Sequence, residues 1–213
     1  MANVIAVGDN AVIYVSSDYK SVEKVYKKSQ YTEYHDEYLK EVEDAIFINK
    51  QISGNLLAKD LYLTMIDHND SNETIIYPRY ISSFEELLNN LFDNSKLQLV
   101  KRIMQRTLMS YIILYQKTLK IHGNLTYRHI LLNIDDDPVI GGWGSMEKGN
   151  CKAHYKEFIW FVLQLRDYKF GVIELIQPKL IADLIPKSYT EITNDINNMS
   201  DEDIKTIFDH WIV

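Results

Sequence analysis

Short hydrophobic runs separated by polar turns dominate the first third of the chain. Such runs, rich in β-branched and aromatic residues, are typical of β-strands. Five strands are predicted in this way, over residues 4–7, 12–15, 22–26, 56–66 and 74–80. Between the third and fourth, over residues 31–51, apolar residues recur every three or four positions, which indicates an amphipathic helix. The stripe expected to face the sheet consists of Leu39, Val42, Ile46 and Phe47.

The rest of the chain has the longer periodicity of helices. Ser83 and Glu86 form a capping-box pattern that begins the first of them. Further helices are predicted over residues 97–120, 154–166, 171–184 and 201–211. The last has Ser200 as its N-cap and Asp203 in its first turn. A β-rich part followed by a mostly helical part predicts an α+β fold, with the boundary between Tyr80 and Ser83.

Composition narrows the class of protein. With 213 residues, 46% hydrophobic and 25% charged, the chain is expected to form one globular domain. The formal net charge of −7 argues against general binding to nucleic acid or to an anionic membrane. Apolar runs stay below the roughly 18 residues that a membrane span requires. The single Cys151 and a start without a signal-peptide pattern favour an intracellular, cytoplasmic protein.

The most distinctive segment is KIHGNLTYRHILLNIDDDPVIGGWG, residues 120–144. It begins with the polar turn His122-Gly123-Asn124-Leu125, which an apolar run follows at Ile130-Leu131-Leu132. A turn of acids, Asp135-Asp136-Asp137, then leads to a short strand that ends at Gly142-Trp143-Gly144. The layout is that of two polar loops separated by an apolar run, a turn of acids and a short strand.

This segment resembles the catalytic loop of protein kinases, H-R-D-L-x-x-x-x-N, followed by the D-F-G element. The ordered series of segments is similar to a small protein kinase domain from about residue 4 to about residue 166. The resemblance implies a two-lobed kinase-like fold. Residues 1–80 would form a small β-rich N-lobe with one helix, and residues 81–213 a reduced, mostly helical C-lobe.

The resemblance also implies a remnant of a nucleotide site. Gly8 is the one glycine kept from the glycine-rich loop, and Lys24 stands where the family has its phosphate-binding strand lysine. Glu43 is the preferred helix partner of Lys24, with Glu41 as the alternative. The segment around Pro78 takes the position of the hinge that receives adenine.

The positions that carry the family's chemistry differ. Asn124 stands where the catalytic aspartate would be, His129 where the metal-binding asparagine would be, and Gly142 where the D-F-G aspartate would be. A neutral amide cannot act as the base, glycine offers no ligand, and imidazole is a poor ligand for Mg²⁺. Packing positions are retained: Trp143 replaces the D-F-G phenylalanine, and Glu157 replaces an aspartate that braces the catalytic loop.

We therefore predict a pseudokinase without metal or cofactor, in which weak metal-independent ATP binding is the most that the remnant site would allow. It would act on a protein partner, such as an active kinase or a signalling complex. Fifteen tyrosines and many Ile, Asn and Lys residues suggest a viral or bacterial-effector protein, located in the host cytoplasm or nucleus if viral. Two alternatives remain. One is a closed scaffold; the other is a divergent phosphotransferase or nucleotidyltransferase with metal ligands from Asp135, Asp136, Asp137 or Glu147.

Overall fold

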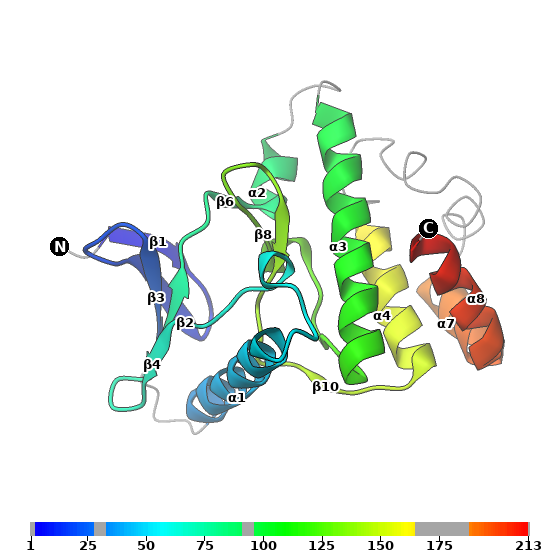
Figure 1. The fold of residues 1–213 in the computed structure, drawn as a ribbon, viewed down its shortest axis with the longest axis horizontal. Coiled ribbons are helices and arrows are strands. Elements are labelled where there is room, and N and C mark those ends of the chain that lie inside the picture. The colour runs from blue at the N-terminus through cyan, green and yellow to red at the C-terminus, as the bar shows by residue number, and fades with distance from the viewer. Residues whose placement is uncertain (1–2, 28–32, 91–95, 165–187, 213) are drawn as a thin grey trace.

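The computed structural model describes residues 3–27, 33–90, 96–164 and 188–212 (Figure 1). The predicted helix over residues 171–184, and the last residues of the one predicted over 154–166, lie outside this part of the chain. The described residues form a mixed α/β structure, with an antiparallel sheet on one side and helices on the other (Figure 1).

The N-terminal sheet has five antiparallel strands in the order β1-β2-β3-β5-β4. Their bounds are β1 Asn3–Val7, β2 Ala11–Val15, β3 Ser21–Tyr26, β4 Asp67–Asn69 and β5 Thr74–Pro78. Lys24 of β3 stands opposite Ile13 of β2 on one side and Ile75 of β5 on the other. The strand lysine therefore lies in the middle of the sheet, held in register by both neighbours.

The predicted strand over residues 56–66 is wrong. Residues Lys59–Leu61 form a short 3-10 helix, η1, and β4 begins only at Asp67. The reason is a long-range pairing, because the backbone N–H of Leu63 donates to the carbonyl of Ile140 at 2.7 Å. The hydroxyl of Tyr62 also donates to the carbonyl of Ser110 at 2.7 Å. The stretch therefore packs against the second part of the molecule, and only its last residue, Ile66, bonds to the sheet, through an N–H that donates to the carbonyl of Ile76 at 2.8 Å.

Helix α1 (Glu33–Ser53) connects β3 to η1, and its buried face differs from the predicted one. Val42 of the predicted stripe is buried, whereas Leu39 and Ile46 are 46% and 48% exposed. The buried face also carries two carboxylates, Glu41 and Asp44. A hydrophobicity pattern treats these acids as polar surface, and for that reason the sequence pattern pointed to a neighbouring face.

Five helices are described in the second part of the chain: α2 (Phe84–Asn89), α3 (Leu97–Thr118), α4 (Cys151–Leu163), α7 (Tyr189–Asn198) and α8 (Asp201–Ile212). The capping box of Ser83 and Glu86 at the start of α2 is confirmed. So is the cap of α8, where the backbone N–H of Asp203 donates to the Ser200 hydroxyl at 3.1 Å. Among the described residues, no helix is long and apolar enough to cross a membrane.

Two small sheets connect the helical part to the segment with the kinase-like motifs. In the first, β7 (Lys120–Ile121) pairs with β10 (Glu147–Lys148). The second contains β6 (Ser82–Ser83), β8 (Ile130–Leu132) and β9 (Pro138–Ile140). A continuous hydrophobic core runs from the inner face of α1 through these strands to α3 and α4. Because β8 and β9 pack into this core, the loops at their ends are anchored to buried strands.

Candidate functional site

Lys24 and Glu41 form the centre of the candidate site. The Lys24 ammonium lies 2.5 Å from Glu41 Oε2, and Glu41 is only 4% exposed. The prediction that Glu43 is the partner is therefore wrong, and the alternative, Glu41, is the partner. Consecutive residues of an α-helix are rotated by about 100°, so Glu43 points about 200° away from Glu41. It is exposed to solvent.

Two tyrosines complete the surroundings of the Glu41 carboxylate. The hydroxyl of Tyr26 donates to Oε2 at 2.5 Å, and that of Tyr77 donates to Oε1 at 2.9 Å. Burial raises the pKa of both phenols, and the negative charge of Glu41 raises them further. Both tyrosines therefore stay protonated as donors. With Lys24, they surround a buried carboxylate with three donors, which compensates for its removal from water.

The turn around Gly8 is held by contacts within the protein. The Lys27 ammonium donates to the Gly8 carbonyl at 2.7 Å, and the Gly8 N–H donates to the Ala11 carbonyl at 2.9 Å. The Asn10 side chain donates to Glu37 of α1. A Cβ on Gly8 would meet only the Ala11 carbonyl oxygen at 3.4 Å, an ordinary contact. The described structure thus gives no steric reason for a glycine at this position.

Glu157 supports the loop that contains Asn124. Its carboxylate accepts the backbone N–H of His122 at 3.1 Å and that of Leu125 at 2.9 Å, and also accepts the hydroxyl of Tyr111. The predicted brace is confirmed. His122 is fully buried and contacts the Gly141 carbonyl through Nε2 at 2.7 Å. Burial lowers the pKa of His122, so its imidazole is neutral at pH 7.

His129 and Gly142 are packed directly against each other. Gly142 has a φ of +74°, and a Cβ built on it would lie 2.4 Å from Cδ2 of His129. The His129 ring is held in place by a contact of 2.7 Å between Nδ1 and the carbonyl oxygen of Asn124. Burial, and then the neighbouring His122, lower the pKa of His129 to about 4. A neutral imidazole therefore occupies the space in which a side chain at position 142 would lie.

The structure brings the three degenerate positions together. Asn124, His129 and Gly142 all lie at the junction of the loop after β7 and the end of β9. This set does not fit Mg²⁺, because it offers an amide, a crowded imidazole and no carboxylate. Among the described residues, no group of three or more His, Cys, Asp or Glu side chains is placed to hold a metal ion.

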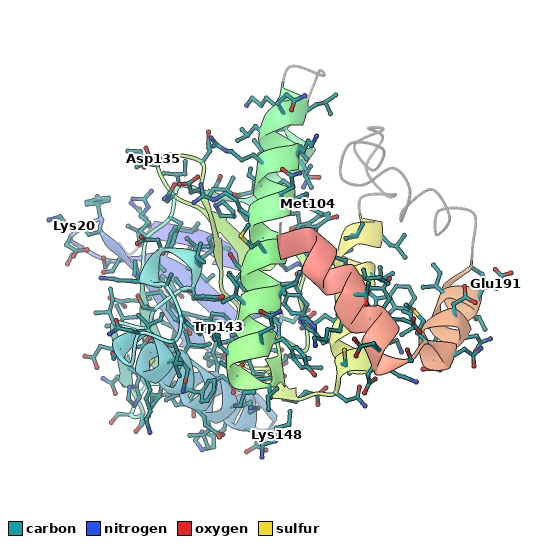
Figure 2. The ribbon with its side chains drawn as sticks, turned by 45° about the vertical axis from the view of Figure 1, so that its right-hand side comes forward. Lys20, Met104, Asp135, Trp143, Lys148 and Glu191 are labelled. Carbon is teal, nitrogen blue, oxygen red and sulfur yellow. The ribbon has the colours of Figure 1, made fainter. Side chains whose placement is uncertain are left out.

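Two of the residues proposed as displaced ligands contact α3. Asp137 pairs with Arg106 of α3, and the Asp135 carbonyl accepts from Arg102 at 3.1 Å. Figure 2 shows Asp135 on the outer turn, well separated from the buried Trp143. Glu147 is exposed in β10, opposite Ile121. The turn of acids thus ties β8 and β9 to α3.

The segment after β9 retains its packing. Trp143 is 2% exposed, and its indole N–H donates to the Leu63 carbonyl at 2.8 Å. Gly144 has a φ of +126° and passes close to Glu41, since a Cβ on it would lie 3.3 Å from the Glu41 Cβ. Trp143 therefore ties this segment to the stretch before β4, and Gly144 lies against α1.

Sequence reasoning missed Asp44. This carboxylate is fully buried, accepts from the Lys40 ammonium at 2.9 Å, and lies 3.6 Å from that of Lys120. The available signal was its spacing, three residues after Glu41 and four after Lys40, which places all three on adjacent faces of one helix.

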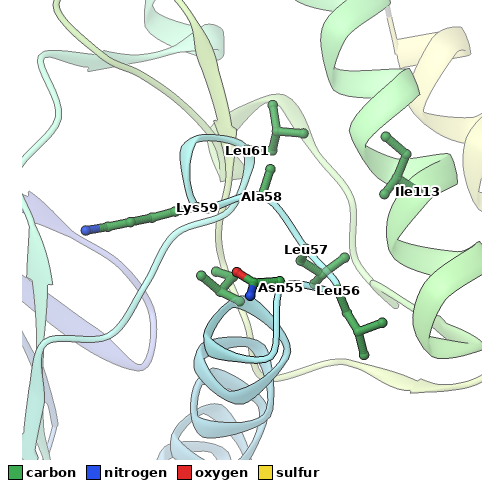
Figure 3. A pocket seen from close by; sticks show the side chains of 8 residues that line it. Asn55, Leu56, Leu57, Ala58, Lys59, Leu61 and Ile113 are labelled. Carbon is green, nitrogen blue, oxygen red and sulfur yellow. The ribbon is translucent and has the colours of Figure 1, made fainter.

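The cavity in Figure 3 lies outside the candidate site. It is an open pocket of about 580 Å³, lined by the end of α1, by η1 and by α3. The side chains of Leu57, Leu61 and Ile113 give it a mostly apolar lining, whereas Lys59 points away from them (Figure 3). It contains none of the residues that the resemblance assigned to nucleotide binding.

Comparison with known proteins gives a distant likeness. No protein-family model and no curated protein matches the sequence. Among solved structures, the chain is similar to one described as "Structure of vaccinia related kinase 3", with 15% sequence identity and a TM-score of 0.49. The match covers 68% of this chain and 47% of that one, so the present chain spans about half the length of that protein.

Proposed function

We propose that the chain is a catalytically inactive kinase-like protein, a pseudokinase, that acts by binding another protein. The arrangement of its elements supports a kinase-like origin. A five-stranded antiparallel sheet carries helix α1 between its third and fourth strands in sequence, and Lys24 is paired with that helix. In this proposal residues 1–80 form an N-lobe and residues 81–213 a reduced C-lobe.

The observation that carries the proposal is the packing of His129 on Gly142. Phosphoryl transfer requires carboxylates that hold Mg²⁺ and a base that orients the hydroxyl. Here position 142 has no side chain, and its space is filled by an imidazole. Asn124 is an amide and cannot accept the proton. One lost ligand can be replaced by a neighbour, but here position 142 cannot carry a side chain while His129 keeps its place, and position 124 offers no carboxylate.

The retained polar groups of the site are engaged within the protein. Lys24 is paired with Glu41, and the Gly8 turn is tied to Lys27 and, through Asn10, to α1. The Lys24–Glu41 pair is compatible with a bound phosphate, because the strand lysine of active kinases pairs with the helix glutamate while it contacts the nucleotide. What positions 124 and 142 do not supply is a carboxylate to hold the metal ion that bridges the phosphates. We therefore propose that ATP binds weakly, if it binds, and independently of Mg²⁺.

A protein partner is proposed because the described segment between Gly144 and α4 is too short to form a platform for a peptide substrate. Helix α4 begins at Cys151, capped by Asn150, so only residues 145–150 separate it from Gly144. Within that interval β10 pairs with β7, and the backbone of Met146 is bound by α1. We propose that this chain is a viral or effector protein and that it regulates an active kinase or another signalling protein.

A thermal-shift assay on the full chain tests the nucleotide part of the proposal. Purified protein is heated with ATP alone, with ATP and MgCl₂, and with MgCl₂ alone. We expect either no shift or a small shift with ATP that MgCl₂ does not increase. A shift that appears only when ATP and MgCl₂ are present together would contradict the proposal and favour a divergent phosphotransferase.

A further inference from the structure

Helix α1 is held at two points by buried acids that lie one turn apart. The first point is Glu41, whose partners Lys24, Tyr26 and Tyr77 all belong to the sheet. The second is Asp44, whose partners beyond α1 belong to the other part of the molecule. The two carboxylates therefore connect one helix to two different bodies of structure.

Both oxygens of Asp44 are used. Oδ1 accepts from Lys40 at 2.9 Å and lies 3.6 Å from the ammonium of Lys120, and Oδ2 accepts the backbone N–H of Met146 at 3.1 Å. The Lys40 ammonium also donates to the Met146 carbonyl at 2.9 Å. Met146 is thus bound through both of its backbone groups. Its side chain is only 1% exposed, so the attachment is buried.

Lys120 adds a second contact with α1. Its ammonium lies 4.2 Å from the centre of the Phe47 ring and 3.6 Å from Asp44. Lys120 belongs to β7, which pairs with β10 immediately after Met146. Any displacement of α1 would therefore separate Asp44 from donors on two paired segments at once. A buried carboxylate that loses its partners is strongly destabilising, so such a displacement is opposed.

We propose that α1 is permanently docked, because Asp44 and Glu41 together form a two-point clamp that requires no nucleotide, metal ion or partner protein. The inference goes beyond the proposed function, since it concerns the conformation of the helix and would hold for an active or an inactive protein. Its consequence is that the surface around α1 is always presented in the same shape.

Hydrogen–deuterium exchange of the full chain, measured by mass spectrometry, tests the clamp. Without ligand, the central amides of α1 should exchange within about tenfold of those in the buried part of α3. Adding ATP, with or without MgCl₂, should leave the exchange of α1 unchanged. An α1 that exchanges hundreds of times faster than α3, and becomes protected only when ATP or MgCl₂ is added, would overturn the proposal.

Two variants address the clamp itself. Asp44→Asn keeps the shape of the side chain but removes the charge that faces Lys40 and Lys120, and exchange in α1 and around Met146 should rise about tenfold or more. Lys40→Met keeps the aliphatic stem and should raise exchange in the same segments by about threefold, which keeps the test valid if Asp44→Asn does not fold. Glu43→Gln is the matched control on the exposed side of the helix. The proposal is overturned if both clamp variants exchange like the control.

Discussion

The imidazole of His129 occupies the space that a side chain on residue 142 would require. A Cβ on Gly142 would lie within 3.0 Å of three carbon atoms of His129, and the backbone there has a φ of +74°. The two positions are therefore matched to each other. A metal ligand cannot be regained at position 142 unless position 129 also changes.

A first prediction concerns this pair. Gly142→Asp alone should lower the free energy of unfolding by about 2–4 kcal/mol, because the added side chain overlaps His129 and strains a left-handed backbone. His129→Asn combined with Gly142→Asp should recover about 1–2 kcal/mol of that loss, since it removes the overlap but not the backbone strain. Urea denaturation of the two single variants and the double variant measures the coupling.

The control for this prediction is Gly8→Ala, because a Cβ at Gly8 meets only an ordinary contact at 3.4 Å. Its effect should be below about 1 kcal/mol. The two single variants, Gly142→Asp and His129→Asn, each change the free energy of unfolding. If the change in the double variant equals the sum of those two changes, the two positions are not coupled.

A second prediction concerns the ion pair of the site. Glu41→Gln should lower the free energy of unfolding by about 2–4 kcal/mol, because Lys24 loses a buried charged partner and two tyrosine hydroxyls lose a strong acceptor. Glu43→Gln, on the same helix but exposed, should change it by less than about 0.5 kcal/mol. Equal effects of the two substitutions in chemical denaturation would argue against Glu41 as the partner of Lys24.

A third prediction concerns the brace beneath the loop. Glu157→Gln should lower the free energy of unfolding by about 2–3 kcal/mol, since the amide cannot accept from two backbone N–H groups and a hydroxyl equally well. Tyr111→Phe removes one of the donors and should cost only about 1 kcal/mol. In the Glu157→Gln variant, the backbone amides of His122 and Leu125 should exchange their hydrogens faster than in the unmodified chain. Unchanged exchange there would contradict the role of the brace.

A fourth prediction concerns pH. Burial lowers the pKa of His129 to about 4 and that of His154 to about 3 in the folded chain, whereas both return to about 6.5 on unfolding. Below about pH 6.5 the unfolded chain therefore binds more protons, and stability should fall as the pH drops towards 4. Each histidine contributes up to about 1.4 kcal/mol per pH unit. Stability should be nearly independent of these groups above about pH 7.

His129→Gln should reduce this dependence. Urea denaturation at about pH 7.5 and about pH 5 gives the loss of stability for each protein, and the variant should lose less than the unmodified chain. An identical loss in both would mean that His129 does not titrate in the predicted range.

The sequence predicts local features better than long-range ones. The caps at Ser83 and Ser200 follow from residues three positions apart, and the structure has both. The residues before β4 favour a strand, but Leu63 pairs with Ile140, far along the chain. Such a partner cannot be found from local propensity.

The candidate site shows the same division. The motif spacing led to Lys24, His129 and Gly142, and it suggested the brace by Glu157. It did not distinguish Glu41 from Glu43, because that choice depends on which face of α1 meets the sheet. The packing of His129 on Gly142 could not be predicted either, since it depends on a positive φ and on the path of two loops in space.

The central claim is that the chain does not transfer phosphate, and a radiolabelled phosphotransfer assay tests it most directly. Full-length protein is incubated with labelled ATP and MgCl₂ or MnCl₂, alone and with a general protein acceptor, beside Lys24→Ala. The account predicts no label on either protein above the level of the Lys24→Ala variant. Label that accumulates with the unmodified chain and disappears with Lys24→Ala would contradict it.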